Sequence, residues 1–148
     1  MSPRNRRPPL VPVLLAVVAA VAAAASCGTR KTPTEPADAP DPGATFSRVQ
    51  SQIFTPSCAL SGCHAGPAPK QGMDLSAGRA YAQVVGVPSV ETGRLRIAPG
   101  DAAGSYMVSK VQGDATITGS RMPFGGPYLP PDKEKLLADW VRRGAPND

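Results

Sequence analysis

The most informative part of this chain is Cys58-Ala59-Leu60-Ser61-Gly62-Cys63-His64. Two cysteines followed at once by a histidine are typical of covalent haem c attachment. In that chemistry the two thiols add to the porphyrin vinyl groups, and the adjacent histidine becomes the proximal iron ligand. The spacing here is C-x-x-x-x-C-H, two residues longer than the usual C-x-x-C-H. Gly62 helps the longer loop to bulge, because glycine tolerates unusual backbone angles.

Other uses of the same residues stay open on spacing alone. Cys58 and Cys63 could form a disulfide, which an exported location permits. A zinc site is a weaker interpretation, because Cys58, Cys63 and His64 supply three ligands and a structural zinc site takes four. The four intervening residues disfavour a redox pair of the C-x-x-C type. His64 is the only histidine, which excludes any site built from two or more histidines within one copy.

The composition predicts one small domain with long loops and a thin core. The chain has 148 residues, with 18 prolines, 15 glycines and only seven aromatic residues. A small domain of this kind buries little apolar surface of its own, so it needs a staple, a metal or a prosthetic group.

Residues 1–26 have the features of a lipoprotein signal peptide. Three arginines precede an apolar run over residues 10–25, which is shorter than the ~20 apolar residues that span a bilayer. The run ends in Ala24-Ala25-Ser26-Cys27, which resembles a bacterial lipobox, although Ala24 stands where leucine is usual. We therefore expect Cys27 to be lipidated and to begin the mature protein. The alternative is ordinary cleavage nearby, which would leave Cys27 as a free thiol.

Residues 27–44 are predicted to form a Pro-rich tether. They contain four prolines and no large apolar side chain, so this segment cannot fold on its own. Such a segment is semi-rigid and extends by ~3.1 Å per residue, which would hold the following domain away from a membrane surface.

Residues 45–148 are predicted to form a small all-α domain, because four stretches have helical patterns and none alternates like a strand. The first helix begins after Thr45 and is expected to stop at Pro56. The second covers about residues 76–85, and the third ends at Gly113. The last begins at Pro131 and ends before Gly144 and Pro146, with one apolar face: Leu136, Leu137, Trp140 and Val141.

Several short motifs carry a resemblance that covers residues 46–146. In order along the chain they are Val49-Gln50-Ser51-Gln52-Ile53-Phe54, Gly72-Met73-Asp74-Leu75-Ser76, Ala98-Pro99-Gly100-Asp101 followed by Ser105, Arg121-Met122-Pro123-Phe124-Gly125-Gly126, and Leu137-Ala138-Asp139-Trp140-Val141 with Gly144-Ala145. Together with the Cys-His motif, this order is similar to the c-type cytochrome domains of planctomycete and myxobacterial exported proteins, which are related to class I monohaem cytochromes c. The resemblance implies an all-α, class I cytochrome c-like domain, wrapped around one covalent haem c, whose first and last helices pack across each other.

The sixth iron ligand is expected to be Met122. With no second histidine, a thioether is the leading candidate, and three methionines follow the signal peptide. Met107 lies in a helical stretch, where filling the core is its expected role. Met73 follows His64 closely, on the side that wraps the proximal ligand. Met122 precedes the last helix in a Gly- and Pro-rich loop, where the class I pattern places its distal methionine. The resemblance therefore implies that His64 and Met122 ligate the iron and that Cys58 and Cys63 hold the porphyrin.

Supporting contacts can also be predicted. The ring N–H of His64 should donate to a carbonyl within residues 66–69, because ligating imidazoles are generally oriented in this way. Arg94, Arg96 or Arg121 could pair with haem propionates, although each has the plain alternative of a solvated surface charge. Trp140 is expected in the core between the terminal helices.

The predicted function is one-electron transfer, not enzymatic catalysis, by a haem domain exported to the periplasmic side of a bacterial membrane. The lipid anchor would attach the domain to that membrane, and its partners would be redox proteins of the cell envelope. Gly28, which follows Cys27, resembles the residue found at that position in lipoproteins of the outer membrane. Residues 1–26 hold three of the 16 basic residues and none of the 11 acidic ones, so the mature chain is nearly neutral and nucleic-acid binding has no support. The alternatives are a haem peroxidase or small-ligand sensor with an open sixth position, and a haem-free interaction module stapled by a disulfide.

Overall fold

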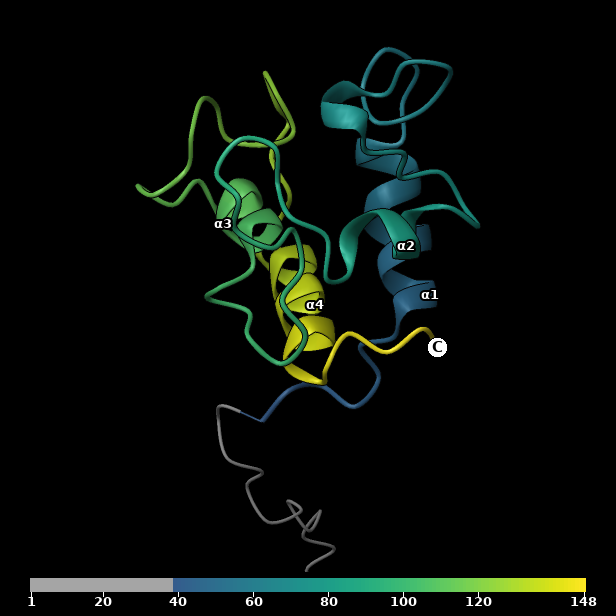
Figure 1. The fold of residues 1–148 in the computed structure, drawn as a ribbon. Helices are drawn as coiled ribbons and strands as arrows, with labels where there is room; N and C mark the ends of the chain where they lie inside the picture. Colours follow the sequence, from purple (N-terminus) through teal and green to yellow (C-terminus); the bar gives the residue numbers. More distant parts are fainter. Residues whose placement is uncertain (1–38) are drawn as a thin grey trace, which may run out of the picture. The chain divides into compact units, whose positions relative to one another are not determined.

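The computed structural model describes residues 39–148, which form a helix-rich fold without strands (Figure 1). The predicted signal peptide, Cys27 and most of the tether lie outside these residues. The elements in chain order are α1 (Phe46–Val49), the π-helix η1 (Gln50–Cys58), the 3-10 helix η2 (Lys70–Gly72), α2 (Ala80–Val84), α3 (Tyr106–Gln112) and α4 (Pro131–Arg142). The all-α class is thereby confirmed for the described part of the chain.

The start of α1 is fixed by two caps. The Thr45 side chain accepts a hydrogen bond from the Arg48 backbone N–H at 3.2 Å, as its predicted capping role requires. Asp148, at the other end of the chain, accepts the Phe46 N–H on its carboxylate at 2.8 Å. The last residue of the chain is therefore hydrogen-bonded to the start of α1.

The first helix does not stop at Pro56, so that prediction is wrong. The helix widens from α1 into η1 and continues through Pro56 to Cys58. Pro56 has no N–H to donate, and a π-type hydrogen bond from the Ala59 N–H to the Phe54 carbonyl at 2.7 Å closes the last turn around it. As a result Cys58, the first residue of the motif, lies on a rigid helix end instead of in a loop.

The other helix boundaries follow local signals. α2 begins at Ala80, four residues later than expected, because Gly78 adopts a φ of 79° and the Asp74 side chain accepts the Ser76 N–H at 2.9 Å. α3 ends at Gly113, which has a φ of 74°, and α4 begins at Pro131. Both of these boundaries confirm the predictions.

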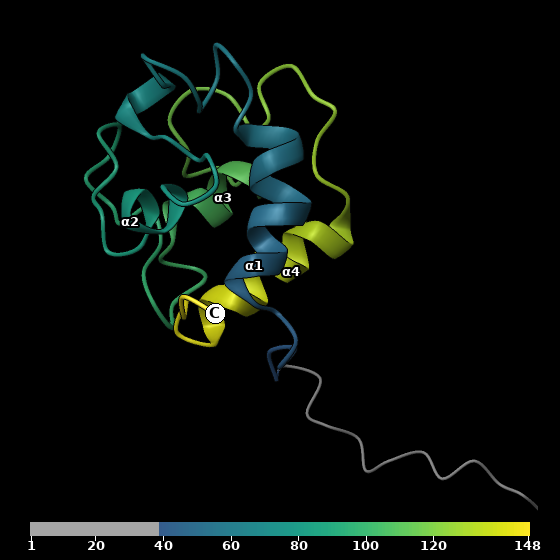
Figure 2. The same cartoon turned by 90° about the vertical axis from the view of Figure 1, so that its right-hand side faces the viewer.

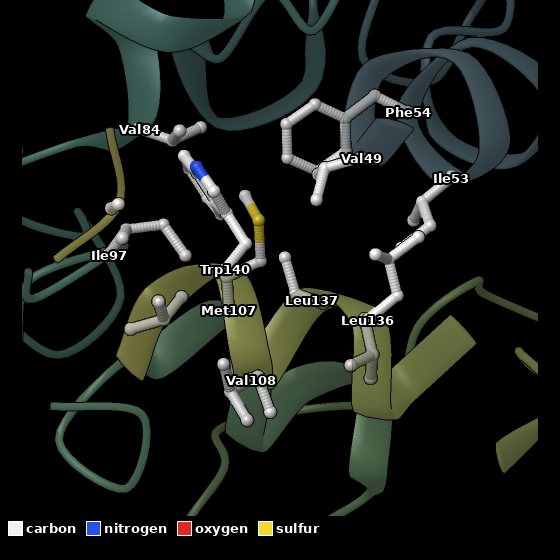
Figure 3. Packing of buried hydrophobic residues seen from close by; sticks show 14 of the residues in the cluster. Val49, Ile53, Phe54, Val84, Ile97, Met107, Val108, Leu136, Leu137 and Trp140 are labelled. Carbon is white, nitrogen blue, oxygen red and sulfur yellow. The ribbon is translucent and has the colours of Figure 1, made fainter. Parts of the chain in front are cut away.

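A single apolar core lies between the first helix, α3 and α4 (Figure 3). Trp140 of α4 is fully buried, and the centroid of its ring lies 5.5 Å from the ring centroid of Phe46 in α1. The first and last helices are therefore in contact. Met107 of α3 is only 9% exposed and belongs to the same cluster, as its predicted core role requires. Each large side chain buried in this way contributes about 1.5–3 kcal/mol.

The segment leading into α1 is fastened to α4. Asp139 of α4 is 1% exposed and accepts the backbone N–H of Asp41 at 3.2 Å. Arg143, just after α4, donates to the carbonyl of Ala44. We call these two contacts the latch. Residues 41–44, at the end of the predicted tether, are therefore held against the helical domain.

The latch and the motif loop lie at opposite ends of the described domain. In Figures 1 and 2, residues 39–45 and the C-terminus are at the lower end, whereas the loops over residues 59–72 and 114–128 are at the upper end. Within residues 39–148, none of the helices is long and apolar enough to cross a bilayer.

Candidate functional site

The motif forms a closed loop at the end of η1. The backbone N–H of Cys63 donates to the Leu60 carbonyl at 2.9 Å, and that of His64 donates to the Cys58 carbonyl at 3.1 Å. Gly62 makes the turn with a φ of 79°, in agreement with its predicted role. The extra residues of the long spacing are thus accommodated in a bulge that brings His64 back to the helix end.

Cys58 and Cys63 are both free thiols in this structure. Burial, assisted by the neighbouring Cys63, raises the pKa of the Cys58 thiol to about 12, so it stays neutral at pH 7. A neutral, half-buried thiol behaves as a small apolar group and lacks the thiolate character that redox-active and metal-binding cysteines need. Cys63 is exposed. Both thiols are thus available for chemistry in this structure.

His64 is oriented as a metal-ligating imidazole would be. Its Nδ1 lies 3.1 Å from the carbonyl oxygen of Lys70, one residue beyond the predicted range of 66–69. A carbonyl can only accept, so Nδ1 carries the ring proton and Nε2 keeps its lone pair. Burial lowers the pKa of His64, although the backbone carbonyls of Lys70 and Met73 oppose that shift. The imidazole is therefore neutral at pH 7, the form that binds iron.

Met122 is half-buried and belongs to the connection between α3 and α4. The loop over residues 114–128 in that connection lies at the same end of the domain as the motif loop (Figure 2). The backbone N–H of Met122 donates to the Lys110 carbonyl at 2.8 Å, whereas its side chain is outside the buried cluster. Met73 packs half-buried against that cluster. Of the three candidate methionines, Met107 is thus the one committed to the core.

Two of the three candidate arginines are already engaged. Arg121 pairs with Glu134 at 2.6 Å between Nη2 and Oε1, and its guanidinium lies 4.3 Å from the Tyr128 ring centroid. Arg94 donates to the Ser109 hydroxyl at 3.2 Å and to the Ala103 carbonyl at 3.1 Å.

Arg96 differs because it is buried without an acidic partner. It is 7% exposed and donates only to the carbonyls of Gln71, at 2.9 Å, and Gln83, at 2.8 Å. No salt bridge forms at Arg96 within residues 39–148. Burial lowers its pKa, but guanidinium keeps its charge in proteins. The charge of Arg96 is also felt at His64, whose pKa it lowers. A buried, uncompensated cation near the motif histidine is suited to an anionic ligand.

The sequence did not predict a polar network formed by Glu91, Tyr106 and Lys110. The Glu91 carboxylate accepts from the Tyr106 hydroxyl at 2.7 Å and lies 3.3 Å from the Lys110 ammonium. Neither Tyr106 nor Lys110 belongs to a recognisable polar motif, and Lys110 is one of the buried residues of α3. A lysine within an otherwise apolar helix face was the one signal that could have indicated a buried partner.

The donor set of the described residues fits a covalent haem. It comprises two free thiols, a neutral imidazole with Nε2 unused, and a thioether in a loop at the same end. No cluster of three or more His, Cys, Asp or Glu able to hold a metal ion occurs in the described part of the chain. Haem iron needs no such cluster, because the porphyrin supplies the other ligands. Two clefts of about 320 and 240 Å³ lie away from Cys58, His64 and Met122.

Comparisons with protein-family models, curated proteins and solved structures gave no match to this chain. Its function therefore has to be inferred from the chemistry of its own residues.

Proposed function

We propose that this chain is a haem c electron carrier with a class I cytochrome c-like fold and His64/Met122 axial ligation. The observation that carries the proposal is the motif loop itself. It presents two free thiols beside an imidazole whose Nδ1 is committed to the Lys70 carbonyl. That commitment orients the ring and leaves Nε2 for iron.

Each residue has a separate task in this proposal. Cys58 and Cys63 would hold the porphyrin through thioether bonds, and His64 and Met122 would supply the two protein ligands of the iron. The haem supplies a one-electron Fe(III)/Fe(II) couple. Two axial protein ligands leave no position for a substrate, so the proposed role is electron transfer and not catalysis.

Arg96 provides the charge that a haem propionate requires. The Arg96 side chain is buried, donates hydrogen bonds to the carbonyls of Gln71 and Gln83, and lowers the pKa of His64. A carboxylate brought to this position would pair with the cation and remove most of its desolvation cost.

Exposed apolar side chains beside the proposed ligands also favour a porphyrin. Leu60 lies between the two cysteines and is 47% exposed, and Phe124 follows Met122 by two residues and is 77% exposed. Large apolar side chains in these positions match an apolar cofactor better than they match water. The same cofactor would add apolar contacts to a domain that has few aromatic residues.

The proposed cellular setting depends on residues 1–44. Signal peptide, lipidated Cys27 and tether would place the domain on the periplasmic side of a bacterial membrane, with envelope redox proteins as partners. A peroxidase or sensor role would instead require an open or labile sixth position, and rapid binding of carbon monoxide or cyanide distinguishes it.

The test is to express the full chain in a host that attaches haem c, denature it and extract it with acidic organic solvent. We expect the haem to stay with the polypeptide. Cys58→Ser and Cys63→Ser should each leave one thioether bond and shift the absorption of the reduced haem, whereas the control Cys27→Ser should not. Colourless protein, extractable haem or an intact Cys58–Cys63 disulfide would overturn the proposal.

A further inference from the structure

Lys110 of α3 holds the segment that ends at Met122 from both sides. Its ammonium donates to the Thr118 carbonyl at 2.8 Å, and its own carbonyl accepts the Met122 N–H at 2.8 Å. Lys110 is itself 7% exposed. The backbone of residues 118–122 is therefore fixed to α3 at its first and last residues.

Glu91 and Tyr106 complete this fastening. The Tyr106 hydroxyl donates to Glu91 Oε2 at 2.7 Å and accepts the Thr118 N–H at 3.0 Å. The same carboxylate oxygen lies 3.3 Å from the Lys110 ammonium. Glu91 thus bonds to both side chains that hold the beginning of the segment.

The other oxygen of Glu91 reaches the proximal side. Glu91 Oε1 accepts from the Gln71 side chain at 3.2 Å, and Gln71 follows Lys70, whose carbonyl faces His64. Gln71 has a φ of 58°, in the left-handed region that non-glycine residues rarely adopt. It persists there with its side chain on Glu91 and its carbonyl on Arg96. One carboxylate therefore joins the loop behind His64 to the loop that carries Met122.

We propose that Glu91 is a positioning residue that keeps Met122 in place as the distal iron ligand, by tying the segment 118–122 to the loop behind His64. This inference rests on the proposed function. The ion pair joins a buried lysine to a half-buried glutamate. Such a pair gains little stability, because desolvation offsets the attraction, but it fixes the relative positions of the groups it joins. Loss of this tie should let Met122 leave the iron more often while the haem stays attached.

The sharpest test removes one oxygen atom. Tyr106→Phe keeps the ring and deletes the hydroxyl that joins Glu91 to Thr118. The matched control is Tyr81→Phe, which deletes a hydroxyl that donates to the Ala145 carbonyl at 3.0 Å, near the C-terminal end. We expect Tyr106→Phe to accelerate imidazole binding to the ferric protein by roughly five- to tenfold, the factor that corresponds to one lost hydrogen bond. Tyr81→Phe should leave that rate unchanged.

A second pair of variants tests the carboxylate itself. Glu91→Ala should weaken the near-infrared band of the iron–thioether bond and accelerate imidazole binding. Glu91→Gln keeps an oxygen for Tyr106 and Lys110 and should restore much of the wild-type behaviour. The inference is overturned if Tyr106→Phe and Glu91→Ala both behave like Tyr81→Phe while the wild type shows the thioether band. Wild-type protein without haem, or with haem but without that band, would instead overturn the proposed function.

Discussion

Truncating Met107 and Met122 to alanine separates a core methionine from a ligand methionine. Met107 is 9% exposed within the cluster of α3 and α4, so Met107→Ala removes a buried side chain and leaves a cavity. We expect a loss of about 2–5 kcal/mol in the free energy of unfolding. For a domain of this size that loss corresponds to a fall in Tm of roughly 8–20 °C. The haem spectrum should change little.

Met122→Ala should have the opposite profile. The side chain is half-buried in a loop and lies outside the core cluster, so its truncation should cost only about 1 kcal/mol of packing. The covalent haem should remain, but the iron should lose its thioether and accept external ligands. Because methionine ligation raises the reduction potential, its loss should lower that potential.

Both variants are compared by near-infrared absorbance, redox titration and denaturant unfolding. The ferric iron–thioether band should vanish in Met122→Ala and persist in Met107→Ala, whereas the larger loss of stability should appear in Met107→Ala. An unchanged band and potential in Met122→Ala would refute its assignment as the distal ligand. They would also remove most of the case for an iron closed to substrates.

Three further outcomes are expected. Arg96→Gln should lower the reduction potential, because a buried positive charge beside the proposed haem favours the reduced iron. The control Arg94→Gln should change the potential less. Equal shifts in the two variants would contradict the special role of Arg96. Burial alone would raise the pKa of Asp139, but hydrogen bonds outweigh this effect and lower it below the usual value. Its contribution to stability is therefore present above the unfolded pKa of about 4 and is lost as pH falls through the folded pKa. Asp139→Asn should flatten the acid limb of unfolding, measured as the free energy of unfolding against pH, and an unchanged acid limb would contradict this role. Mass spectrometry of the mature N-terminal peptide should show lipid on Cys27; an unmodified Cys27, or a chain that starts after it, would refute the anchor.

Local signals predicted the end of α3 and the start of α4. Gly113 and Pro131 act through their own backbone preferences, so their effects are visible in sequence. The predicted helix end at Pro56 was wrong, because a proline ends a helix only where its missing N–H cannot be accommodated. Here the π-type hydrogen bonding of η1 accommodates it. The late start of α2 depends on the backbone angle adopted by Gly78, which the helical spacing of its neighbours does not reveal.

The sequence predicted the candidate ligand residues of the site but not the residues that hold them in position. The spacing of Cys58, Cys63 and His64 is itself a chemical pattern. By contrast, Glu91 and Gln71 are 20 residues apart and meet only because the loops fold onto one another. Contacts of this kind have no period in the sequence. Arg96 could be suspected as a charge, but its burial without an acidic partner emerges only from the packing.

The latch would have a mechanical consequence in the proposed membrane-attached protein. A pull transmitted through residues 41–44 would first load the contacts of Asp41 with Asp139 and of Ala44 with Arg143. From there the force would pass into α4, which is packed through Trp140 against the first helix. The loops of His64 and Met122 are at the opposite end and lie outside this line of force. If residues 1–44 attach the domain to a membrane as proposed, drag on the domain would therefore reach the latch before it could disturb the end that holds His64, and that end would face away from the point of attachment.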